Sequence, residues 1–132
     1  MKRARPPSGS AIDRHFAERA RARRLFDAVQ RAVERVGPAT VRVARSQVSF
    51  SRARAFAWAW CPDRWLRGAD VAPLVLSFAL PRPLSSRRLK EVVPLPRGRF
   101  LHHLEVRRVR DIDADVVTWL RSAWTAAAPK EP

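Results

Sequence analysis

The chain lacks several residue types and patterns that mark particular classes of protein. It contains no tyrosine, no asparagine and a single cysteine, Cys61, in 132 residues. One thiol excludes an intrachain disulfide framework and a zinc site made of four thiolates. The best apolar runs, residues 55–61 and 74–80, are strand length, far short of the roughly 20 residues that span a membrane. We therefore expect a cytoplasmic protein that binds no membrane.

Glycine is also scarce, and the sequence motifs of common enzyme classes are absent. The four glycines are scattered, and there is no Walker loop, no G-x-G-x-x-G, no G-x-S-x-G and no H-E-x-x-H. The sequence therefore indicates neither a glycine-rich phosphate cradle nor a motif-borne catalytic centre. A centre assembled only in space would leave no such motif. We favour a non-enzymatic protein with no cofactor and no bound metal.

Positive charge is what the composition supplies in excess. Lysine and arginine total 27 against 12 acidic residues, which gives a formal net charge of +15. Such an excess attracts polyanions and suggests an anionic ligand or a nucleic acid as partner. Only three of the basic residues are lysines, however, and such a preference for arginine over lysine is what a GC-rich genome would impose. Part of the charge therefore reflects composition, and the placement of the arginines has to carry any function.

Hydrophobic periodicity predicts one long helix near the start of the chain. Apolar side chains recur at helical spacing over residues 25–36. Gly37 and the proline after it end this helix, because glycine suits the left-handed conformation after a helix and proline cannot continue one. Upstream, Ile12 and Phe16 indicate a further turn or two, broken from the main helix near residues 18–22.

After this helix the apolar residues alternate, which predicts strands. The predicted strands are residues 41–44, 47–51, 55–60, 74–80 and 100–106. The third would place Phe56, Trp58 and Trp60 on one face and three alanines on the other, a face flat enough for a homodimer contact. Residues 81–99 hold four prolines and are predicted as an extended loop with one helical turn near residues 85–90.

A second helix is predicted at the end of the chain, capped by Asp111 or Asp113. The order is then helix, about five short strands, helix. Short connections favour an antiparallel sheet, because parallel pairing needs long crossovers. We predict an α+β fold, an antiparallel sheet of about five strands with the N- and C-terminal helices packed on one face. Residues 11–128 would form this single domain, between a disordered basic tail at 1–10 and a short tail at 129–132.

The residues able to bind a metal or act as a nucleophile form no recognisable centre. On a strand His103 and Glu105 share a face while His102 points the other way, and two ligands from one face do not fill a zinc shell. We therefore interpret His102 as a core residue and His103 as a surface residue. The acids at 111–115 lack the glycine and the terminal glutamate of a calcium loop and fit a helix cap. Cys61 has no recognisable activating base, which indicates a structural thiol.

The arginines are the strongest remaining signal. The candidates for binding an anion from the strands and hairpin are Arg45, Arg52 and Arg54. The candidates for binding nucleic acid are Trp65, Arg87 and Arg88. Trp65 is flanked by arginines, and its indole ring could stack on a base. The alternative interpretation is a solvated basic surface, with Trp65 covering an edge of the sheet.

Several short motifs, in their order and spacing, resemble a known bacterial family. Residues 45–50 (Arg-Ser-Gln-Val-Ser-Phe) stand where that family usually has a Lys-Thr/Ser-x-Ile-x-Phe run. Residues 80–84 (Leu-Pro-Arg-Pro-Leu), 99–103 (Arg-Phe-Leu-His-His) and 119–121 (Trp-Leu-Arg) also match. From His15 to the last helix, the chain resembles the family catalogued as domain of unknown function 5655.

The resemblance implies a small α+β module for which no activity is established. It makes the matched positions candidates for a shared site. These positions are His15, Arg45, Phe50, Arg54 and His102. Arg45 replaces the usual lysine, and an arginine, with its pKa above about 12, serves poorly as a base or Schiff-base nucleophile. This departure favours anion binding over lysine chemistry.

Three functions follow from these observations. The first is a non-enzymatic binding module whose basic sheet face or hairpin holds an anionic ligand or partner. The second is a nucleic-acid-associated accessory protein. The third is a small enzyme that uses His15 or His102, with an arginine as the anchor for an anionic substrate.

Overall fold

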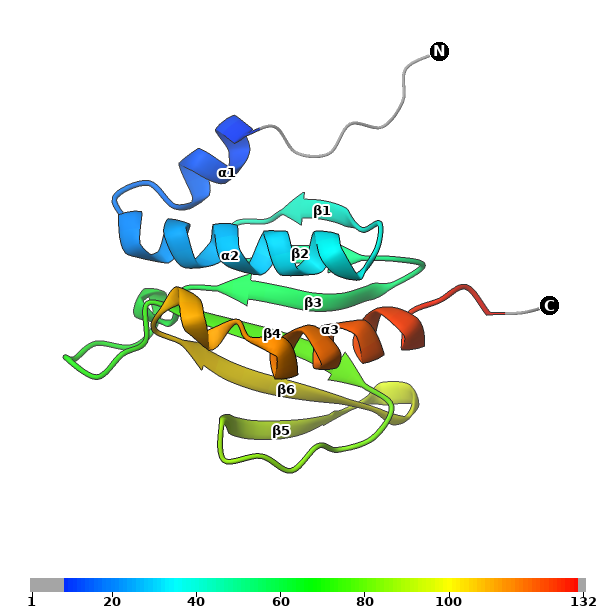
Figure 1. Cartoon of the computed structure of the whole chain (residues 1–132). Helices are drawn as coiled ribbons and strands as arrows, with labels where there is room; N and C mark the ends of the chain where they lie inside the picture. Colours follow the sequence, from blue (N-terminus) through cyan, green and yellow to red (C-terminus); the bar gives the residue numbers. More distant parts are fainter. Residues whose placement is uncertain (1–8, 131–132) are drawn as a thin grey trace, which may run out of the picture.

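The computed structural model describes residues 9–130 and has the predicted α+β architecture (Figure 1). The helices of this part of the chain are α1 (Gly9–His15), α2 (Ala20–Val36) and α3 (Ala114–Ala126). The strands are β1 (Thr40–Val43), β2 (Val48–Ser51), β3 (Ala55–Trp60), β4 (Leu74–Leu80), β5 (Leu89–Leu95) and β6 (Arg99–Val106). All neighbours pair antiparallel, in the order β1-β2-β3-β4-β6-β5. The predicted antiparallel sheet is confirmed, with six strands where about five were expected.

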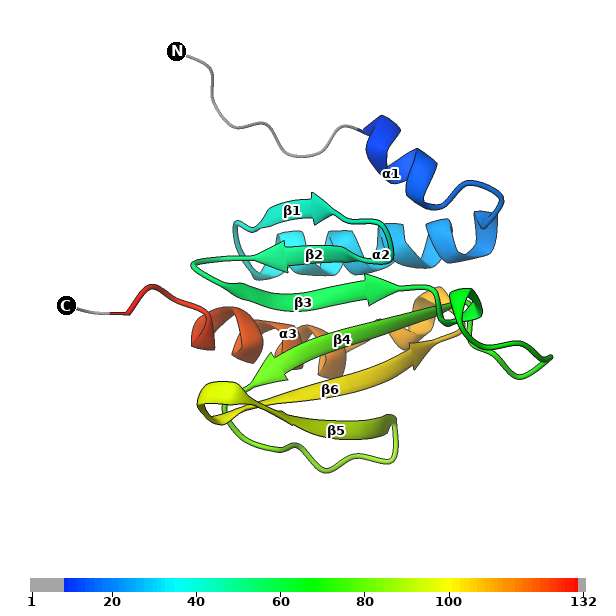
Figure 2. The same ribbon diagram turned by 180° about the vertical axis from the view of Figure 1, so that it is seen from behind.

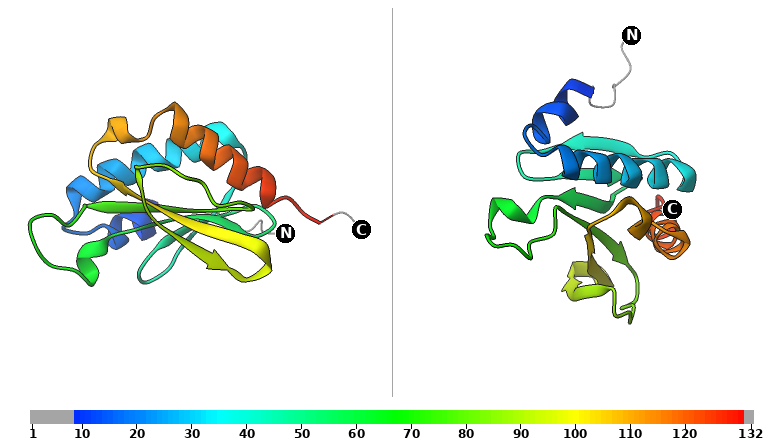
Figure 3. Two further views of the ribbon diagram at one scale, coloured as in Figure 1. Left: turned by 90° about the horizontal axis from the view of Figure 1, so that it is seen from below. Right: turned by 60° about the vertical axis from the view of Figure 1, so that its left-hand side comes forward.

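Helices α2 and α3 cover one face of the sheet and leave most of the other face uncovered. α2 and α3 contact each other and lie across the same face (Figure 1), and the view from behind shows uncovered strands (Figure 2). Seen from below, the molecule has a helical layer over a sheet layer (Figure 3). The prediction that the helices pack on one face is confirmed. We call the sheet surface away from α2 and α3 the open face.

Helix α2 buries the apolar stripe that periodicity predicts. Leu25, Phe26, Val29 and Val33 are at most 3% exposed and belong to the single hydrophobic cluster between helices and sheet. A break precedes the helix, as predicted, because Glu18 has a φ of 63°. Burial of this stripe, rather than intrinsic helix propensity, stabilises the helix in place.

Gly37 follows α2 for a reason other than the predicted one. Its φ of 163° is extended rather than left-handed. The ring of Trp124 packs against it, so that a Cβ at this position would lie 2.6 Å from a ring carbon. Trp124 Nε1 also donates a hydrogen bond to the Pro38 carbonyl oxygen at 2.9 Å. The glycine therefore lets α3 dock against the end of α2.

Strand β5 corrects the prediction for residues 81–99. The prolines predict an extended loop with a helical turn near residues 85–90, but Leu89–Leu95 pairs with β6, and before it residues 86–89 form one hydrogen-bonded turn, closed by the Leu89 N–H on the Ser86 carbonyl oxygen at 3.1 Å, rather than a helix. β5 is the last strand of the sheet, and Pro94 lies within it. An edge strand tolerates proline because one side of its backbone has no ladder partner.

A β-bulge in β3 separates Phe56 from the tryptophans with which it is expected to share a face. The β2–β3 register shifts beside it, so two consecutive residues, Phe56 and Ala57, are both buried in the core. Trp58 and Trp60 lie on the open face and are partly exposed. A bulge turns one side chain to the other face in this way. Because Ala57 and Ala59 are fully buried, the alanine face expected to make a homodimer contact lies beneath the helices.

The predicted tails lie largely outside the described residues. Helix α1 already begins at Gly9, so the last two residues of the predicted tail at 1–10 are helical, and the rest of it is not described. At the other end, residues 129–130 follow α3 without regular structure, and 131–132 lie outside the description. Across residues 9–130, no helix combines the length and the apolar character needed to cross a membrane.

Candidate functional site

A cavity of about 410 Å³ lies on the open face. Its residues come from β3, β4 and β6, from the turn between β1 and β2, and from the loop after β3. They are Ser46, Gln47, Trp58, Trp60, Trp65, Ser77, Leu101 and His103. The loop after β3 curls toward the open face (Figure 3). Cavities of about 300–1,000 Å³ are the usual size of small-molecule sites.

The antiparallel register explains how residues distant in sequence meet at this cavity. Ser49 pairs with Trp58, Trp58 with Ser77, Ser77 with His103, and His103 with Glu91. Side chains of directly paired residues point to the same face. A continuous row of polar and aromatic side chains therefore crosses the open face beneath the cavity.

Ser77 connects two of the rings that form the cavity. Its side chain is at the base of the cavity, and the residue is 2% exposed. Trp60 Nε1 donates to Ser77 Oγ at 2.9 Å, and Oγ lies 2.6 Å from His103 Nδ1. The Trp60 ring meets His103 and Trp65 edge-on, with ring centres 5.9 Å and 5.8 Å apart. These contacts hold the Trp60 and His103 rings in fixed orientations.

His103 presents one ring nitrogen to a ligand. Burial lowers its pKa below the ordinary value of 6.5, the carboxylate of Glu91 opposes this effect, and the neighbouring His102 adds to it. The ring is therefore neutral at pH 7. Nδ1 is engaged with Ser77, whereas Nε2 makes no hydrogen bond within residues 9–130. Nε2 can donate in one tautomer and accept in the other.

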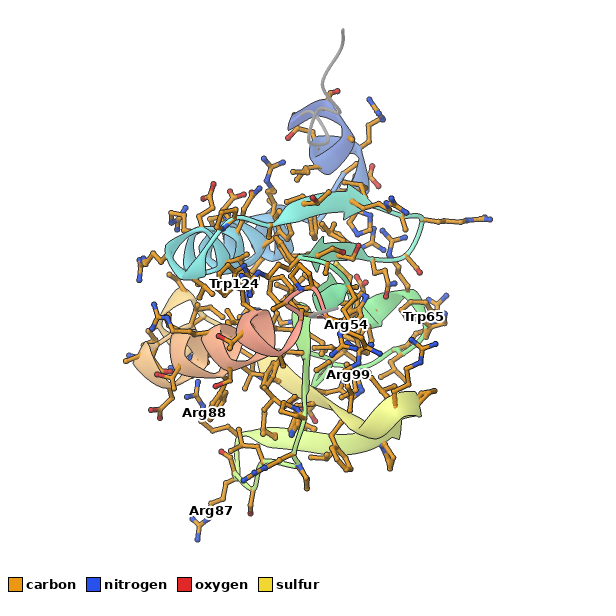
Figure 4. All side chains as sticks on the ribbon, turned by 90° about the vertical axis from the view of Figure 1, so that its right-hand side faces the viewer. Arg54, Trp65, Arg87, Arg88, Arg99 and Trp124 are labelled. Atoms are coloured by element: carbon orange, nitrogen blue, oxygen red, sulfur yellow. The ribbon has the colours of Figure 1, made fainter. Side chains whose placement is uncertain are left out.

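Three arginines gather at one end of the sheet, near the β2–β3 and β5–β6 connections, and we call Arg54, Arg97 and Arg99 the arginine cluster. Arg99 begins β6, two residues before Leu101 of the cavity, and donates to the Ala55 carbonyl oxygen at 3.0 Å. Burial lowers the pKa of Arg99, and the positive charges of Arg54 and Arg97 lower it further. No carboxylate among the described residues forms an ion pair with any of the three. Figure 4 shows Arg54 and Arg99 next to each other.

Arg52 and Arg54, two of the predicted anion-binding residues, hold the end of helix α3. They lie in the tip between β2 and β3, and they donate to the carbonyl oxygens of Trp124 at 3.3 Å and of Ala126 at 2.9 Å, respectively. The Arg52 guanidinium lies 3.5 Å from the centre of the Trp124 ring. Positive charge at a helix C-terminus is favourable because the last carbonyl groups lack helical partners. Arg54 also has a buried Nε with no hydrogen-bond partner in the described chain.

The remaining predicted residues of this region lie elsewhere. Arg45 is exposed in the turn before β2, beside the cavity, whereas Arg52 follows the same strand. The two arginines are therefore at opposite ends of β2. Phe50 is fully buried in the core, where it stacks on Phe26 with ring centres 6.0 Å apart. The structure does not bring Arg45, Phe50 and the hairpin tip into one surface.

His102 is built into the core, in agreement with its interpretation from the sequence. It is fully buried and stacks on Phe78, with ring centres 5.3 Å apart. Its Nε2 accepts a hydrogen bond from the Leu84 N–H at 2.9 Å, which requires an unprotonated Nε2. Burial also lowers its pKa. His102 thus fastens the loop before β5 to the sheet.

His15 is buried at the end of α1. It is 8% exposed, and its ring meets Phe16 edge-on with centres 4.7 Å apart. Burial, and then the positive charge of Arg64, lower its pKa. Its Nε2 is buried without a hydrogen-bond partner among the residues described. Neither His15 nor His102 lines the cavity on the open face.

The candidates for nucleic-acid binding do not share a surface. Trp65 is 61% exposed and lines the cavity. Arg88 donates to the Asp113 carboxylate at 3.0 Å and to the Asp111 carbonyl oxygen at 2.6 Å, and so ties the loop before β5 to the start of α3. Arg87, beside it, is exposed. Figure 4 shows both arginines well apart from Trp65.

Cys61 and the acids of residues 111–115 have structural positions. Cys61 is fully buried, and burial raises the pKa of its thiol. Asp113 caps α3 by accepting a hydrogen bond from the Val116 N–H at 3.2 Å. In the described part of the chain, no three His, Cys, Asp or Glu side chains gather closely enough to share a metal ion.

Comparison with known proteins identifies the family. A family model described as domain of unknown function (DUF5655) matches residues 12–127, most of the chain. The chain belongs to the DUF5655 family. The match contains all six strands and every residue of the cavity and the arginine cluster, and it confirms the resemblance found in the sequence. Neither a curated protein nor a solved structure matches the chain.

Sequence reasoning on this DUF5655 domain selects Trp65 but misses the centre of the cavity. Ser77 leaves one signal, a hydroxyl inside the otherwise apolar run at 74–80. Trp58 shows only strand alternation, and His103 looks like an ordinary surface residue. Their meeting depends on the pairing of β4 with both β3 and β6, which the local pattern does not specify.

Proposed function

We propose that this DUF5655 domain is a non-enzymatic binding module for an anionic ligand or partner, which binds at the arginine cluster. The observation that carries the proposal is the gathering of Arg54, Arg97 and Arg99 without a carboxylate partner among the described residues. Like charges held together destabilise each other, and a bound anion relieves that repulsion. Arg97 is exposed and accessible to such an anion.

The orientation of the cluster suits an oxyanion. A guanidinium group donates several N–H groups in a planar fork that matches phosphate or carboxylate oxygens. Arg54 and Arg99 each give one N–H to a backbone carbonyl oxygen, of Ala126 and Ala55, so these two side chains are already ordered. Ordered donors lose less conformational entropy when the anion binds.

The positions of the reactive groups favour binding over catalysis. His15 and His102, the candidates for a small enzyme, are both buried. The Ser77 hydroxyl contacts His103, but at 2% exposure it offers little surface for attack on a substrate. A cytoplasmic location and a homodimer remain predictions from the sequence.

The test is a calorimetric titration of the protein with short-chain inorganic polyphosphate, carried out at about 50 mM and at about 200 mM salt. We expect binding at low salt that weakens steeply at high salt. Arg97→Ala should weaken binding and lower the slope of log K against log salt by about one. Arg121→Ala is the matched control, because Arg121 is equally an exposed arginine but lies on α3. Equal effects of the two substitutions, or no binding at low salt, would contradict the proposal.

A further inference from the structure

We propose that the cavity on the open face binds the base of a nucleotide, with the base stacked on its indole rings and its polar edge hydrogen-bonded at His103. This inference rests on the proposed function, because the arginine cluster would bind the phosphate of the same ligand. The shared chemistry is a planar base joined to a phosphate. A free nucleotide and a single-stranded nucleic acid both supply it.

The indole rings provide the stacking surface. Trp60 is held in place by Ser77 and by edge-on contact with His103, and Trp65 meets Trp60 edge-on while remaining 61% exposed. Trp58 completes the aromatic lining from the same strand as Trp60. A large aromatic side chain left in solvent gains stability when a planar ring covers it, and bases stack on indoles for this reason.

The polar groups of the cavity select a ring with polar edges. His103 Nε2 has no partner in the described chain, and Ser46 and Gln47 also line the cavity. A saturated apolar ligand would bury these groups without hydrogen bonds, which costs free energy. The edges of a base carry both donors and acceptors, so they suit either tautomer of the neutral His103 ring.

The arginine cluster lies where a phosphate attached to such a base could reach it. Leu101 lines the cavity, and Arg99 is two residues earlier in β6 on the same strand face. Two residues of a strand span about 6.6 Å. The net charge of +15 is complementary to a phosphate-bearing ligand. His103, level with Trp58 and Ser77, is four residues from Arg99 along β6, about 13 Å, whereas Trp60 is level with Glu105, six residues from Arg99 or about 20 Å. A base at the Leu101 end of the cavity can therefore carry a phosphate to the cluster, and a base stacked on Trp60 and Trp65 reaches it through a neighbouring nucleotide of the same strand.

The experiment measures the binding of a set of matched probes by the quenching of tryptophan fluorescence. The probes are adenosine, adenosine monophosphate, ribose 5-phosphate, a short single-stranded oligonucleotide and an abasic oligonucleotide of the same length. The variants are Trp65→Ala and the control Leu66→Ala, whose side chain is 58% exposed in the same loop but does not line this cavity. Because both positions are exposed, neither substitution should unfold the domain, and a thermal melt of each variant checks this.

We expect base-bearing probes to bind more tightly than ribose 5-phosphate or the abasic strand. Trp65→Ala should raise the Kd of base-bearing probes by roughly ten-fold or more and leave abasic binding unchanged, while Leu66→Ala changes neither. Equal affinity for base-bearing and abasic strands would overturn the inference and leave the proposed function standing. Binding of adenosine as tight as that of adenosine monophosphate would support the cavity and contradict the proposed function. No binding of any probe would overturn both.

A second variant separates hydrogen bonding from stacking. His103→Phe keeps a flat ring but removes both ring nitrogens, so base-bearing probes should bind several-fold more weakly while still quenching fluorescence. An unchanged Kd would overturn the role given to His103. The probes also distinguish the source of the base: similar affinity for adenosine monophosphate and the oligonucleotide indicates a free nucleotide, and tight binding of the oligonucleotide alone indicates a single strand.

Discussion

At the scale of single residues, Gly37 is where one missing side chain permits a contact between two helices. Alanine there would place its Cβ 2.6 Å and 2.7 Å from two atoms of the Trp124 ring. We expect Gly37→Ala to lower the free energy of unfolding by about 1–3 kcal/mol, because the ring must shift and strain its contacts. Urea denaturation measures this effect. Gly9→Ala is the control, since a Cβ at Gly9 meets no atom within 4 Å, and an equal loss there would contradict the explanation.

Cys61 allows a second prediction at this scale. The thiol is fully buried and its pKa is raised by burial, so both access and thiolate formation are suppressed. We expect an aromatic disulfide reagent to label native protein more than about a hundred-fold more slowly than urea-unfolded protein, given a typical stability of at least 5 kcal/mol. The reaction is monitored by the absorbance of the aromatic thiolate that the reagent releases. Rapid labelling of the native protein would show that the end of β3 opens readily.

The individual site residues show what a sequence can reveal about function. Trp65 is recognisable because it is an aromatic residue outside the predicted strands and is flanked by Arg64 and Arg67, and the structure then shows that it is exposed. Ser77 and His103 are not, because each is ordinary in its own strand, and they become a pair only when β4 lies beside β6. Arg52 looks like a binding residue from its charge, yet it makes its contacts to α3.

At the scale of elements, the tip of the β2–β3 hairpin clamps the C-terminus of α3. Arg52 donates to the Trp124 carbonyl oxygen and stacks on the Trp124 ring. We expect Arg52→Ala to lower the free energy of unfolding by about 1–2 kcal/mol through loss of the charge-assisted hydrogen bond and the cation–π contact. Denaturant titration tests this. Arg45→Ala, an exposed arginine at the other end of β2, should change stability by less than about 0.5 kcal/mol. Similar losses in both variants would contradict the clamp.

The elements also show where local patterns mislead. The helices are predictable because their apolar spacing is repeated over several turns, and Asp113 at the start of α3 is one of the two caps that the sequence indicates. β5 is missed because proline argues against a strand, and only its edge position removes that conflict. The sequence places the Phe56 side chain on the wrong face of the sheet, because a bulge breaks the strict alternation of faces along β3. The position of a bulge depends on the partner strand.

At the scale of the whole molecule, stability should depend on pH through the histidines. Burial lowers the pKa of His15, His102 and His103 below 6.5, so the folded state binds fewer protons than the unfolded state as pH falls. The stabilisation is present above about pH 6.5 and is lost as the pH falls through the lower pKa values of the folded state. We expect the free energy of unfolding to be smaller at pH 5 than at pH 7.5, measured by urea denaturation.

A matched variant assigns part of this dependence to one residue. His102→Gln does not titrate, and its side-chain oxygen can accept the hydrogen bond that Leu84 N–H donates to the histidine. The variant should therefore show a flatter dependence of stability on pH than the unsubstituted protein. A curve of unchanged steepness would show that His102 is not the group responsible.

The amino-acid sequence by itself determined the helices, most of the strands and the α+β class, because periodic burial is a property of neighbouring residues. It also determined the family and the excess of positive charge. Only the tertiary structure decided which arginines gather: Arg54 comes from the β2–β3 connection, Arg97 from the β5–β6 connection and Arg99 from the start of β6, and β4, which pairs with both β3 and β6, brings these segments to the same end of the sheet. It likewise decided that the tryptophans of β3, Ser77 and His103 form one cavity. Register and bulge set those contacts, and both depend on partners far away in the chain.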